Sequence, residues 1–138
     1  MGVKFAPEAL SSDEVALMVE RSKGQRDKAL IILLWRCGLR ANEAASLNLE
    51  HVRFGGEVAT VYVNNPKGFD RGVKPRTVGI DSRSSAILRD WTAVRGDSPG
   101  PFLPTRTGSR LLTSQIRRSI KLAAANAGLK RRVHPHAL

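Results

Sequence analysis

An arginine at the start of a short helix is the feature of this sequence best suited to bind a phosphate group. Gly38 ends an apolar stretch, and Arg40 follows at the expected beginning of the next helix. Helix N-termini favour anions through their free N–H groups and the macrodipole, and a guanidinium adds a planar fork of donors that matches phosphate. Glu43 lies three residues further on the same helical face and can hold the guanidinium in place. An ordinary surface Arg–Glu pair, which contributes less than about 1 kcal/mol, has the same spacing, so both interpretations remain open.

The charge of the chain points to a polyanionic partner. Its 138 residues include 23 Lys and Arg against 12 Asp and Glu, which gives a net charge of +11 and an isoelectric point near 11.1. Nucleic acid is the usual partner of such a protein. An RNA-binding protein would have the same charge, but aromatic residues make up only 5% of the chain and no RNA-binding box is recognisable, which argues against base stacking.

The residues around Arg40 are expected to be helical. After a lead-in over residues 1–10, Ser11 and Glu14 have the spacing of a capping box, which predicts a helix start. A second helix is predicted over residues 25–35, and because it is apolar all round it should lie inside the domain. A third, short helix is predicted over residues 40–47.

A small β-hairpin should follow these helices. Residues 57–63 are rich in β-branched side chains and read as a strand, and residues 74–80 form a second strand candidate. The segment 64–72 between them is charged and rich in turn-forming residues. We therefore expect a hairpin with a basic tip.

Two further helices complete the predicted domain, which is mainly α with a small antiparallel β-hairpin. Ser82 can cap the first of them, in which Ile87, Trp91 and Val94 share one face. Thr113 can cap the second. The core stripe of this last helix is predicted to be Ile116, Ile120, Ala123 and Ala127. Three cations fall on its other side: Arg117, Arg118 and Lys121. They contact a DNA backbone or form a solvated basic face.

The sequence predicts a cytoplasmic protein without cofactors. Its only cysteine, Cys37, rules out an internal disulfide framework and is expected to be a buried structural thiol. The first residues do not resemble a signal peptide, and we expect no membrane association. His134 and His136 have a spacing that can bind metal, but no cysteine or carboxylate cluster lies near them in the sequence, so no metal site is predicted.

Three segments in the right order resemble the tyrosine recombinase (phage integrase) family. The first resembles its "G-L-R-x-x-E-x-x-x-L" box, with matches at Gly38, Leu39, Arg40, Glu43 and Leu47. Residues 61–63, 66–68 and 74–78 resemble the family's β-hairpin, which carries a catalytic lysine near its turn. Residues 134–138 resemble the start of its "H-x-L-R-H" box. The resemblance covers nearly the whole chain from Leu10 and implies the α-rich recombinase catalytic fold without its last helices.

The resemblance also implies a chemistry. In the family a tyrosine attacks a DNA phosphodiester, forming a 3′-phosphotyrosine link and freeing a 5′-hydroxyl without ATP or metal. Two arginines bind the non-bridging oxygens, a lysine protonates the leaving oxygen, and histidines assist. By position, Arg40 would be the first arginine, Glu43 its support and His136 the histidine that opens the third box. Lys67 would be the general acid, with Lys74 as an alternative because the hairpin is longer here than in the family.

Further basic residues are expected to contact DNA. In the hairpin and after the last helix these are Arg71, Arg76, Arg131 and Arg132, which join the three cations of the last helix.

The leading function is therefore DNA binding within a family that integrates and recombines DNA. The alternatives are a non-enzymatic DNA-binding accessory or regulator that reuses the fold, and a mobile-element remnant with no function of its own. A bacterial, phage or mobile-element origin is expected.

Several groups of the family's active site have no match within the 138 residues. The second arginine is expected directly after Leu138, and the second histidine and the tyrosine nucleophile further on. Tyr62, the only tyrosine, falls in a predicted strand and is expected to pack on the sheet. We therefore expect residues 11–138 to form an incomplete catalytic domain that cannot cleave DNA alone. This domain is also expected to be without the family's N-terminal core-binding domain.

Loss of the last helices should expose apolar surface on the helix over residues 29–35 or its neighbours, and so favour self-association.

Overall fold

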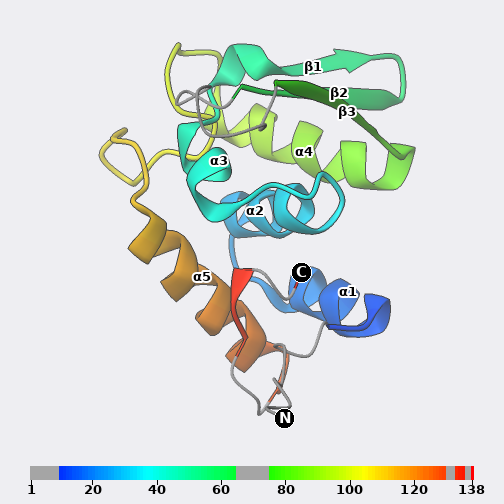
Figure 1. Cartoon of the computed structure of the whole chain (residues 1–138), viewed down its shortest axis with the longest axis vertical. Coiled ribbons are helices and arrows are strands. Elements are labelled where there is room, and N and C mark those ends of the chain that lie inside the picture. The colour runs from blue at the N-terminus through cyan, green and yellow to red at the C-terminus, as the bar shows by residue number, and fades with distance from the viewer. Residues whose placement is uncertain (1–9, 65–74, 130–132, 136–137) are drawn as a thin grey trace, which may run out of the picture.

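The protein is described by a computed structural model, which places residues 10–64, 75–129, 133–135 and 138. Within them the chain is mostly helical with a small sheet, so the predicted fold class is confirmed (Figure 1). The helices are α1 (Ser12–Arg21), α2 (Gln25–Trp35), α3 (Ala41–Ser46), α4 (Ser82–Arg95) and α5 (Thr113–Asn126). A short 3-10 helix, η1 (Leu49–His51), leads into the strands β1 (Val52–Gly55), β2 (Val58–Val63) and β3 (Arg76–Ile80).

Helix α1 begins as its sequence predicts. The Glu14 backbone N–H donates to the Ser11 hydroxyl at 3.1 Å, and the Ser11 backbone N–H donates to the Glu14 carboxylate at 2.9 Å. This reciprocal capping box satisfies two of the N–H groups that the start of a helix leaves free. The side chains that α1 buries are Val15, Met18 and Val19.

Helix α2 lies at the centre of the helical layer. It contacts α1, α3, α4 and α5, and the side chains from Ala29 to Leu34 are at most 2% exposed. The apolar surface predicted for this helix or its neighbours therefore does not lie on these six side chains, which four helices cover, but it does occur on the neighbouring α4 and α5, at Val94 and Leu122. The exposed large hydrophobic residues lie elsewhere: Val58, Tyr62, Val94, Leu112 and Leu122.

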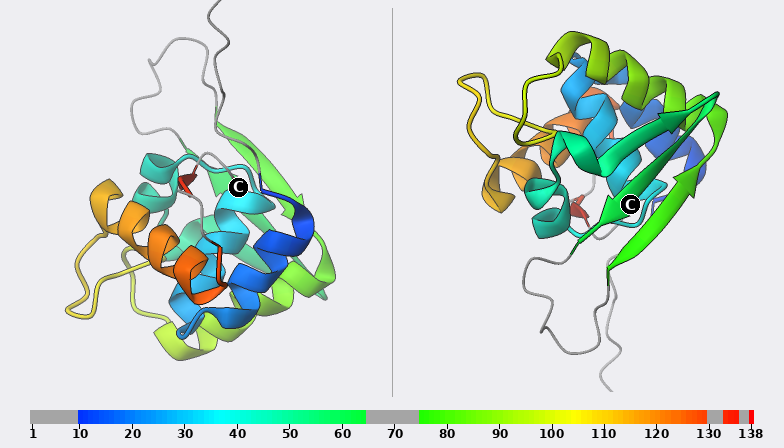
Figure 2. Two further views of the ribbon diagram at one scale, coloured as in Figure 1. Left: turned by 90° about the horizontal axis from the view of Figure 1, so that it is seen from below. Right: turned by 90° about the horizontal axis from the view of Figure 1, so that it is seen from above.

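The strands form an antiparallel sheet in the order β1-β2-β3. The predicted hairpin is confirmed by the pairing of β2 with β3, in which Val63 is opposite Arg76. Strand β1 was not predicted; it pairs with β2 through a turn at Gly56, whose φ of 65° suits glycine. One face of β2, formed by Ala59, Val61 and Val63, is buried on the side of α4, and the other face is exposed (Figure 2).

Helix α4 covers the sheet with a face that differs from the predicted one. The N-cap is Asp81 rather than Ser82, since the Asp81 carboxylate accepts from the Ser84 backbone N–H at 3.2 Å. Of the three residues predicted to share a face, Trp91 is buried and Ile87 packs partly buried against the core, whereas Val94 is 67% exposed. The buried residues of α4 are Ser84, Ser85, Leu88 and Trp91. The Ser85 hydroxyl accepts from the Ala59 backbone N–H at 2.8 Å and thereby joins α4 to β2.

Helix α5 packs through the predicted stripe. Its N-cap is Leu112, one residue before the predicted Thr113. The stripe of Ile116, Ile120, Ala123 and Ala127 is at most 6% exposed. In the loop before this helix, Phe102 and Leu103 are buried, and the Trp91 indole N–H donates to the Phe102 carbonyl at 2.8 Å. Among the helices described, none is both long and apolar enough to span a bilayer.

Candidate functional site

A tight turn between α2 and α3 places Arg40. Gly38 has a φ of 67°, a left-handed conformation that other residues adopt only at a cost. Across this turn the Leu39 backbone N–H donates to the Leu33 carbonyl at 3.2 Å. Arg40 is then the N-cap residue of α3, with an exposed side chain. The turn therefore presents a guanidinium to solvent at the start of a helix, as the sequence predicted.

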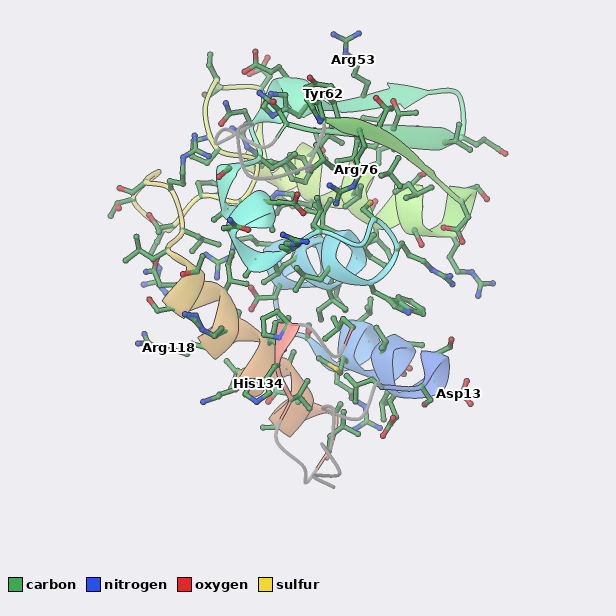
Figure 3. The ribbon with its side chains drawn as sticks, in the orientation of Figure 1. Asp13, Arg53, Tyr62, Arg76, Arg118 and His134 are labelled. Carbon is green, nitrogen blue, oxygen red and sulfur yellow. The ribbon has the colours of Figure 1, made fainter. Side chains whose placement is uncertain are left out.

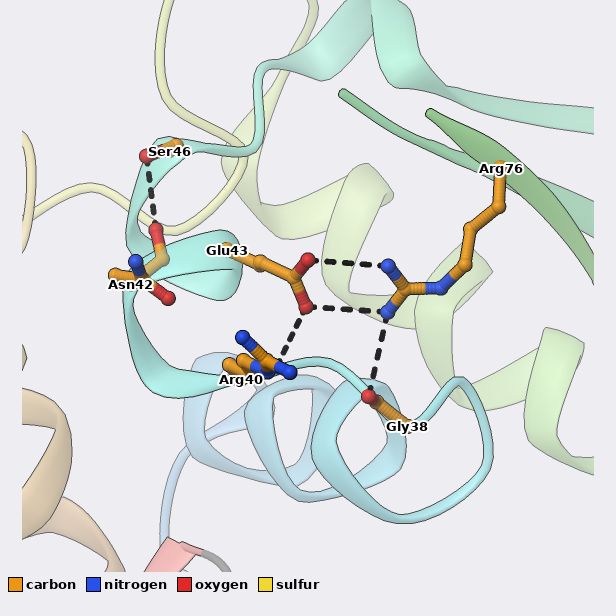
Figure 4. Close-up of polar contacts among 6 residues, drawn as sticks. All are labelled: Gly38, Arg40, Asn42, Glu43, Ser46 and Arg76. Carbon is orange, nitrogen blue, oxygen red and sulfur yellow. Dashed lines mark hydrogen bonds and ion pairs between the residues drawn. The ribbon is translucent and has the colours of Figure 1, made fainter. Parts of the chain in front are cut away.

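A buried carboxylate organises the residues around this turn, which we call the Glu43 cluster (Gly38, Arg40, Glu43 and Arg76). Glu43 is 6% exposed, and its Oε1 accepts from the Arg40 backbone N–H at 2.9 Å. The Arg76 guanidinium donates to Glu43 Oε2 at 3.0 Å and to Oε1 at 3.1 Å, and also to the Gly38 carbonyl at 3.4 Å (Figure 4). The Glu43 carboxylate thus supports Arg40 by accepting the Arg40 backbone N–H. The guanidinium that Glu43 binds is that of Arg76.

The electrostatics of the cluster favour its charged form. Burial alone would raise the pKa of Glu43, but hydrogen bonds from Arg76 and the Arg40 backbone, with the charges of both arginines, outweigh burial and hold that pKa below its ordinary value. The hydrogen bonds to Glu43 raise the pKa of Arg76. Burial raises the pKa of the nearby Cys37 thiol to about 12, against the opposing charge of Arg76, so this cysteine is a buried, protonated thiol.

The C-terminal segment lies beside Arg40. Pro135 and Leu138 share the lining of a hollow of about 150 Å³ with Arg40 and its neighbours in the turn. The segment is anchored by Val133, which is 3% exposed. His134 is half-buried near α5 (Figure 3). The structure therefore brings together the first and third segments of the family resemblance, while His136 itself lies outside the described residues.

The hairpin strands lead away from the same cluster. Arg76 is the first residue of β3 and contacts Glu43 directly, so the sheet end of the hairpin is next to α3. The predicted residues Lys67, Arg71 and Lys74 lie outside the described residues, as do Arg131 and Arg132 of the tail.

A second basic region lies on α5, and we call it the α5 cationic face (Arg117, Arg118 and Lys121). All three side chains are exposed, and Arg118 points outward from the helix (Figure 3). Arg118 also lines a groove of about 380 Å³ together with Arg26 and Arg106. Sequence reasoning did not select these last two arginines. They come from separate segments, and no local pattern links them to α5.

Two remaining questions concern Tyr62 and a possible metal site. Tyr62 is 40% exposed on the outer face of β2, and its ring lies 5.8 Å from that of His51. It packs on the sheet surface, as predicted. In the part of the chain that the structure describes, no group of three or more His, Cys, Asp or Glu side chains could hold a metal ion.

Known proteins resemble this chain in sequence and in fold. The model of the phage integrase family matches residues 8–138. Tyrosine recombinase XerC of Ralstonia pickettii is 32% identical over 154 residues, covering 98% of this chain and 47% of that protein. XerC of Chromobacterium violaceum is 34% identical over 143 residues, covering 98% and 45%. The chain thus spans about half the length of the curated relatives it matches.

Solved structures show the same fold. The crystal structure of XerA recombinase superposes with a TM-score of 0.81 at 23% identity, covering 99% of this chain and 48% of that one. XerH site-specific recombinase, bound to its difH substrate in a pre-cleavage complex, gives 0.74 at 21% identity, covering 99% and 42%. The predicted fold resemblance is confirmed.

Proposed function

The chain belongs to the phage integrase family of tyrosine recombinases, and from this premise we propose that it binds double-stranded DNA with Arg40 on a backbone phosphate. The observation that carries the proposal is the turn between α2 and α3. It exposes the Arg40 side chain while the buried Glu43 carboxylate fixes the Arg40 backbone at 2.9 Å. An exposed guanidinium on a fixed backbone at a helix start is suited to a phosphate oxygen.

We assign the other proposed roles by position in the family pattern. Lys67 would donate a proton to the leaving oxygen, with Lys74 as the alternative, and His136 would assist at the same phosphate. The proximity of Pro135 and Leu138 to Arg40 supports the role of His136, which lies between them in sequence. The contacts that hold the duplex would come from the α5 cationic face, from Arg71 in the hairpin and from Arg131 and Arg132 in the tail.

We also propose that residues 1–138 bind DNA without cleaving it. Cleavage in this family needs a second phosphate-binding arginine and a tyrosine nucleophile. The chain contains one tyrosine, Tyr62, and it lies on the outer face of the sheet beside His51. Incubation of the purified chain with a nicked duplex should give no covalent protein–DNA adduct. Formation of such an adduct would contradict this part of the proposal.

The experiment that tests DNA binding is a titration of duplex DNA against salt for the wild type, Arg40→Ala and Lys67→Ala. Arg53→Ala is the matched control, because this exposed arginine lies on β1, outside the proposed site. Each phosphate contact adds about 0.9 to the slope of log affinity against log salt concentration. We expect binding near a salt concentration of about 0.15 M, weakened by both test substitutions and little changed by the control.

The two rival functions give different results in the same titration. A DNA-binding accessory or regulator would bind selected sequences and tolerate the loss of Arg40. A remnant without its own function would bind weakly and lose binding at modest salt. Either outcome would contradict a working phosphate site at Arg40.

A further inference from the structure

We propose that Arg76 is a positioning residue that acts on a DNA phosphate through Arg40 instead of contacting the phosphate itself. The phosphate part of this proposal rests on the proposed function of Arg40. Arg76 had been expected to contact DNA because it is a cation in the hairpin. Its side chain is partly exposed, but its terminal nitrogens contact Glu43 and Gly38 of the site.

The two terminal nitrogens of Arg76 are both engaged by the protein. Its two terminal nitrogens donate to the two oxygens of Glu43 at 3.0 and 3.1 Å, which is the bidentate geometry of an arginine–carboxylate pair. The second of these nitrogens also donates to the Gly38 carbonyl at 3.4 Å. The edge formed by its two terminal nitrogens, one of the edges that could hold a phosphate in the same bidentate manner, is therefore already occupied by Glu43.

These contacts lie on both sides of the peptide that carries Arg40. Arg76 reaches the Gly38 carbonyl on one side of Leu39, and on the other side Glu43 accepts the Arg40 backbone N–H. Glu43 Oε1 receives both the Arg76 guanidinium and this N–H, so one oxygen atom joins the two arginines (Figure 4). The orientation of the carboxylate, which Arg76 fixes, therefore sets the position of the Arg40 backbone.

The same contacts couple the hairpin to the turn. Arg76 is opposite Val63 in the sheet, so it begins the strand that returns from the hairpin segment. Lys67 and Lys74 belong to that segment in sequence. A displacement of Arg76 at the sheet end of the hairpin would therefore move the Glu43 carboxylate and, through it, the Arg40 backbone.

The first test measures hydrogen exchange of the Arg40 backbone amide by NMR in the free chain. Arg76→Gln removes the charge and the fork, and we expect exchange at Arg40 to become about tenfold faster, as loss of a charge-assisted network implies. Arg53→Gln, the same change on the exposed face of β1, should leave it unaltered. Arg76→Lys, which keeps the charge without the fork, should fail to restore protection. Unchanged exchange in Arg76→Gln would overturn the proposal.

The second test is a double-mutant cycle in DNA binding with Arg40→Ala, Arg76→Gln and both together. If Arg76 acts through Arg40, each single variant lowers the salt slope by about 0.9. The salt slope of the double variant is then no lower than that of either single variant. If Arg76 is an independent phosphate contact, the losses add and the proposal is overturned. A purely structural role would lower the folded fraction and leave the slope unchanged, which also overturns it.

A nearly isosteric variant covers the case in which Arg76→Gln does not fold. Glu43→Gln leaves Arg76 in place and weakens its bidentate grip. A positioning role predicts lower DNA affinity, whereas a direct contact predicts unchanged or higher affinity because the guanidinium is released. If the wild type does not bind DNA, the proposed function fails, and the exchange measurement still decides whether Arg76 holds Arg40 in place.

Discussion

The Glu43 cluster and the α5 cationic face are both basic, yet they hold their arginines in different ways. In the cluster, Glu43 is 6% exposed and receives hydrogen bonds from α3 and from β3. On α5, Arg117, Arg118 and Lys121 are all exposed to solvent. The cluster thus fixes backbone positions to within hydrogen-bond distances, whereas the α5 face contributes charge from side chains that extend into water.

The two regions therefore suit different tasks: the Glu43 cluster can hold a donor in a fixed position, whereas the α5 cationic face supplies long-range positive charge. A phosphate that is to be placed for chemistry needs a donor whose position is set by the protein, because misplacement by about 1 Å can cost about a hundredfold in rate. A duplex that is only to be held needs positive charge, which acts over a Debye length of about 8 Å at physiological salt. We therefore expect substitutions in the cluster to change stability and site geometry, and substitutions on α5 to change mainly the salt dependence of binding.

Removal of the Glu43 side chain should have the largest effect on folding. Glu43→Ala leaves the Arg40 backbone N–H and the Arg76 guanidinium without their buried acceptor, and we expect a loss of about 2–3 kcal/mol in the free energy of unfolding. Urea unfolding with an unchanged m-value would measure it.

The matched control for this substitution is Glu50→Ala. Glu50 is an exposed glutamate in η1, and its loss should change stability by less than about 0.5 kcal/mol. Equal losses for the two alanine variants would remove the distinction between the fixed cluster and the solvated surface.

The elements around the cluster follow from local patterns, but the cluster itself does not. The capping box at Ser11 and the all-apolar run of α2 are signals carried by neighbouring residues, and both predicted their helices. The Arg40 turn was likewise visible in the order of Gly38 and Arg40. The ion pair between Glu43 and Arg76 joins α3 to β3 across the fold. The two residues are 33 positions apart in the sequence, and no local pattern links them.

The other misses have the same cause. Strand β1 is a segment of 4 residues, too short for a clear alternation, and it is defined by its pairing with β2. On α4, Val94 was grouped with Ile87 and Trp91 because all three are apolar, but Val94 is exposed, while two serines, Ser84 and Ser85, are buried beside Leu88 and Trp91. The Ser85 hydroxyl is tolerated there because it bonds to the Ala59 backbone, a partner that only the folded chain supplies.

Acid should weaken the cluster through Glu43, with a smaller effect than deletion because protonation removes the charge but not the side chain. The pKa of Glu43 in the folded chain lies below its ordinary value of 4.5. This carboxylate therefore adds stability above about pH 4.5 that is lost as the pH falls through the folded pKa. Asp81, whose pKa is also lowered, chiefly by its hydrogen bond with Ser84, contributes in the same direction.

The comparison of wild type with Glu43→Gln isolates the share of Glu43, because Asp81 is present in both. Urea midpoints from about pH 7 to about pH 3 should fall more steeply for the wild type than for the variant. Parallel curves would mean that Glu43 is not held in its charged form by the arginines.

Substitution on the α5 cationic face should have the smallest effect on folding and a clean effect on DNA binding. Arg118→Gln removes an exposed charge, so we expect the free energy of unfolding to change by less than about 0.5 kcal/mol. The salt slope of DNA binding should fall by about 0.9 if Arg118 meets one phosphate. The same decrement should appear in the Arg40→Ala background, because independent sites add, whereas Arg76→Gln should lose its effect there. A decrement for Arg118→Gln that disappears without Arg40 would show that the two basic regions are coupled and that α5 also takes part in placing the phosphate.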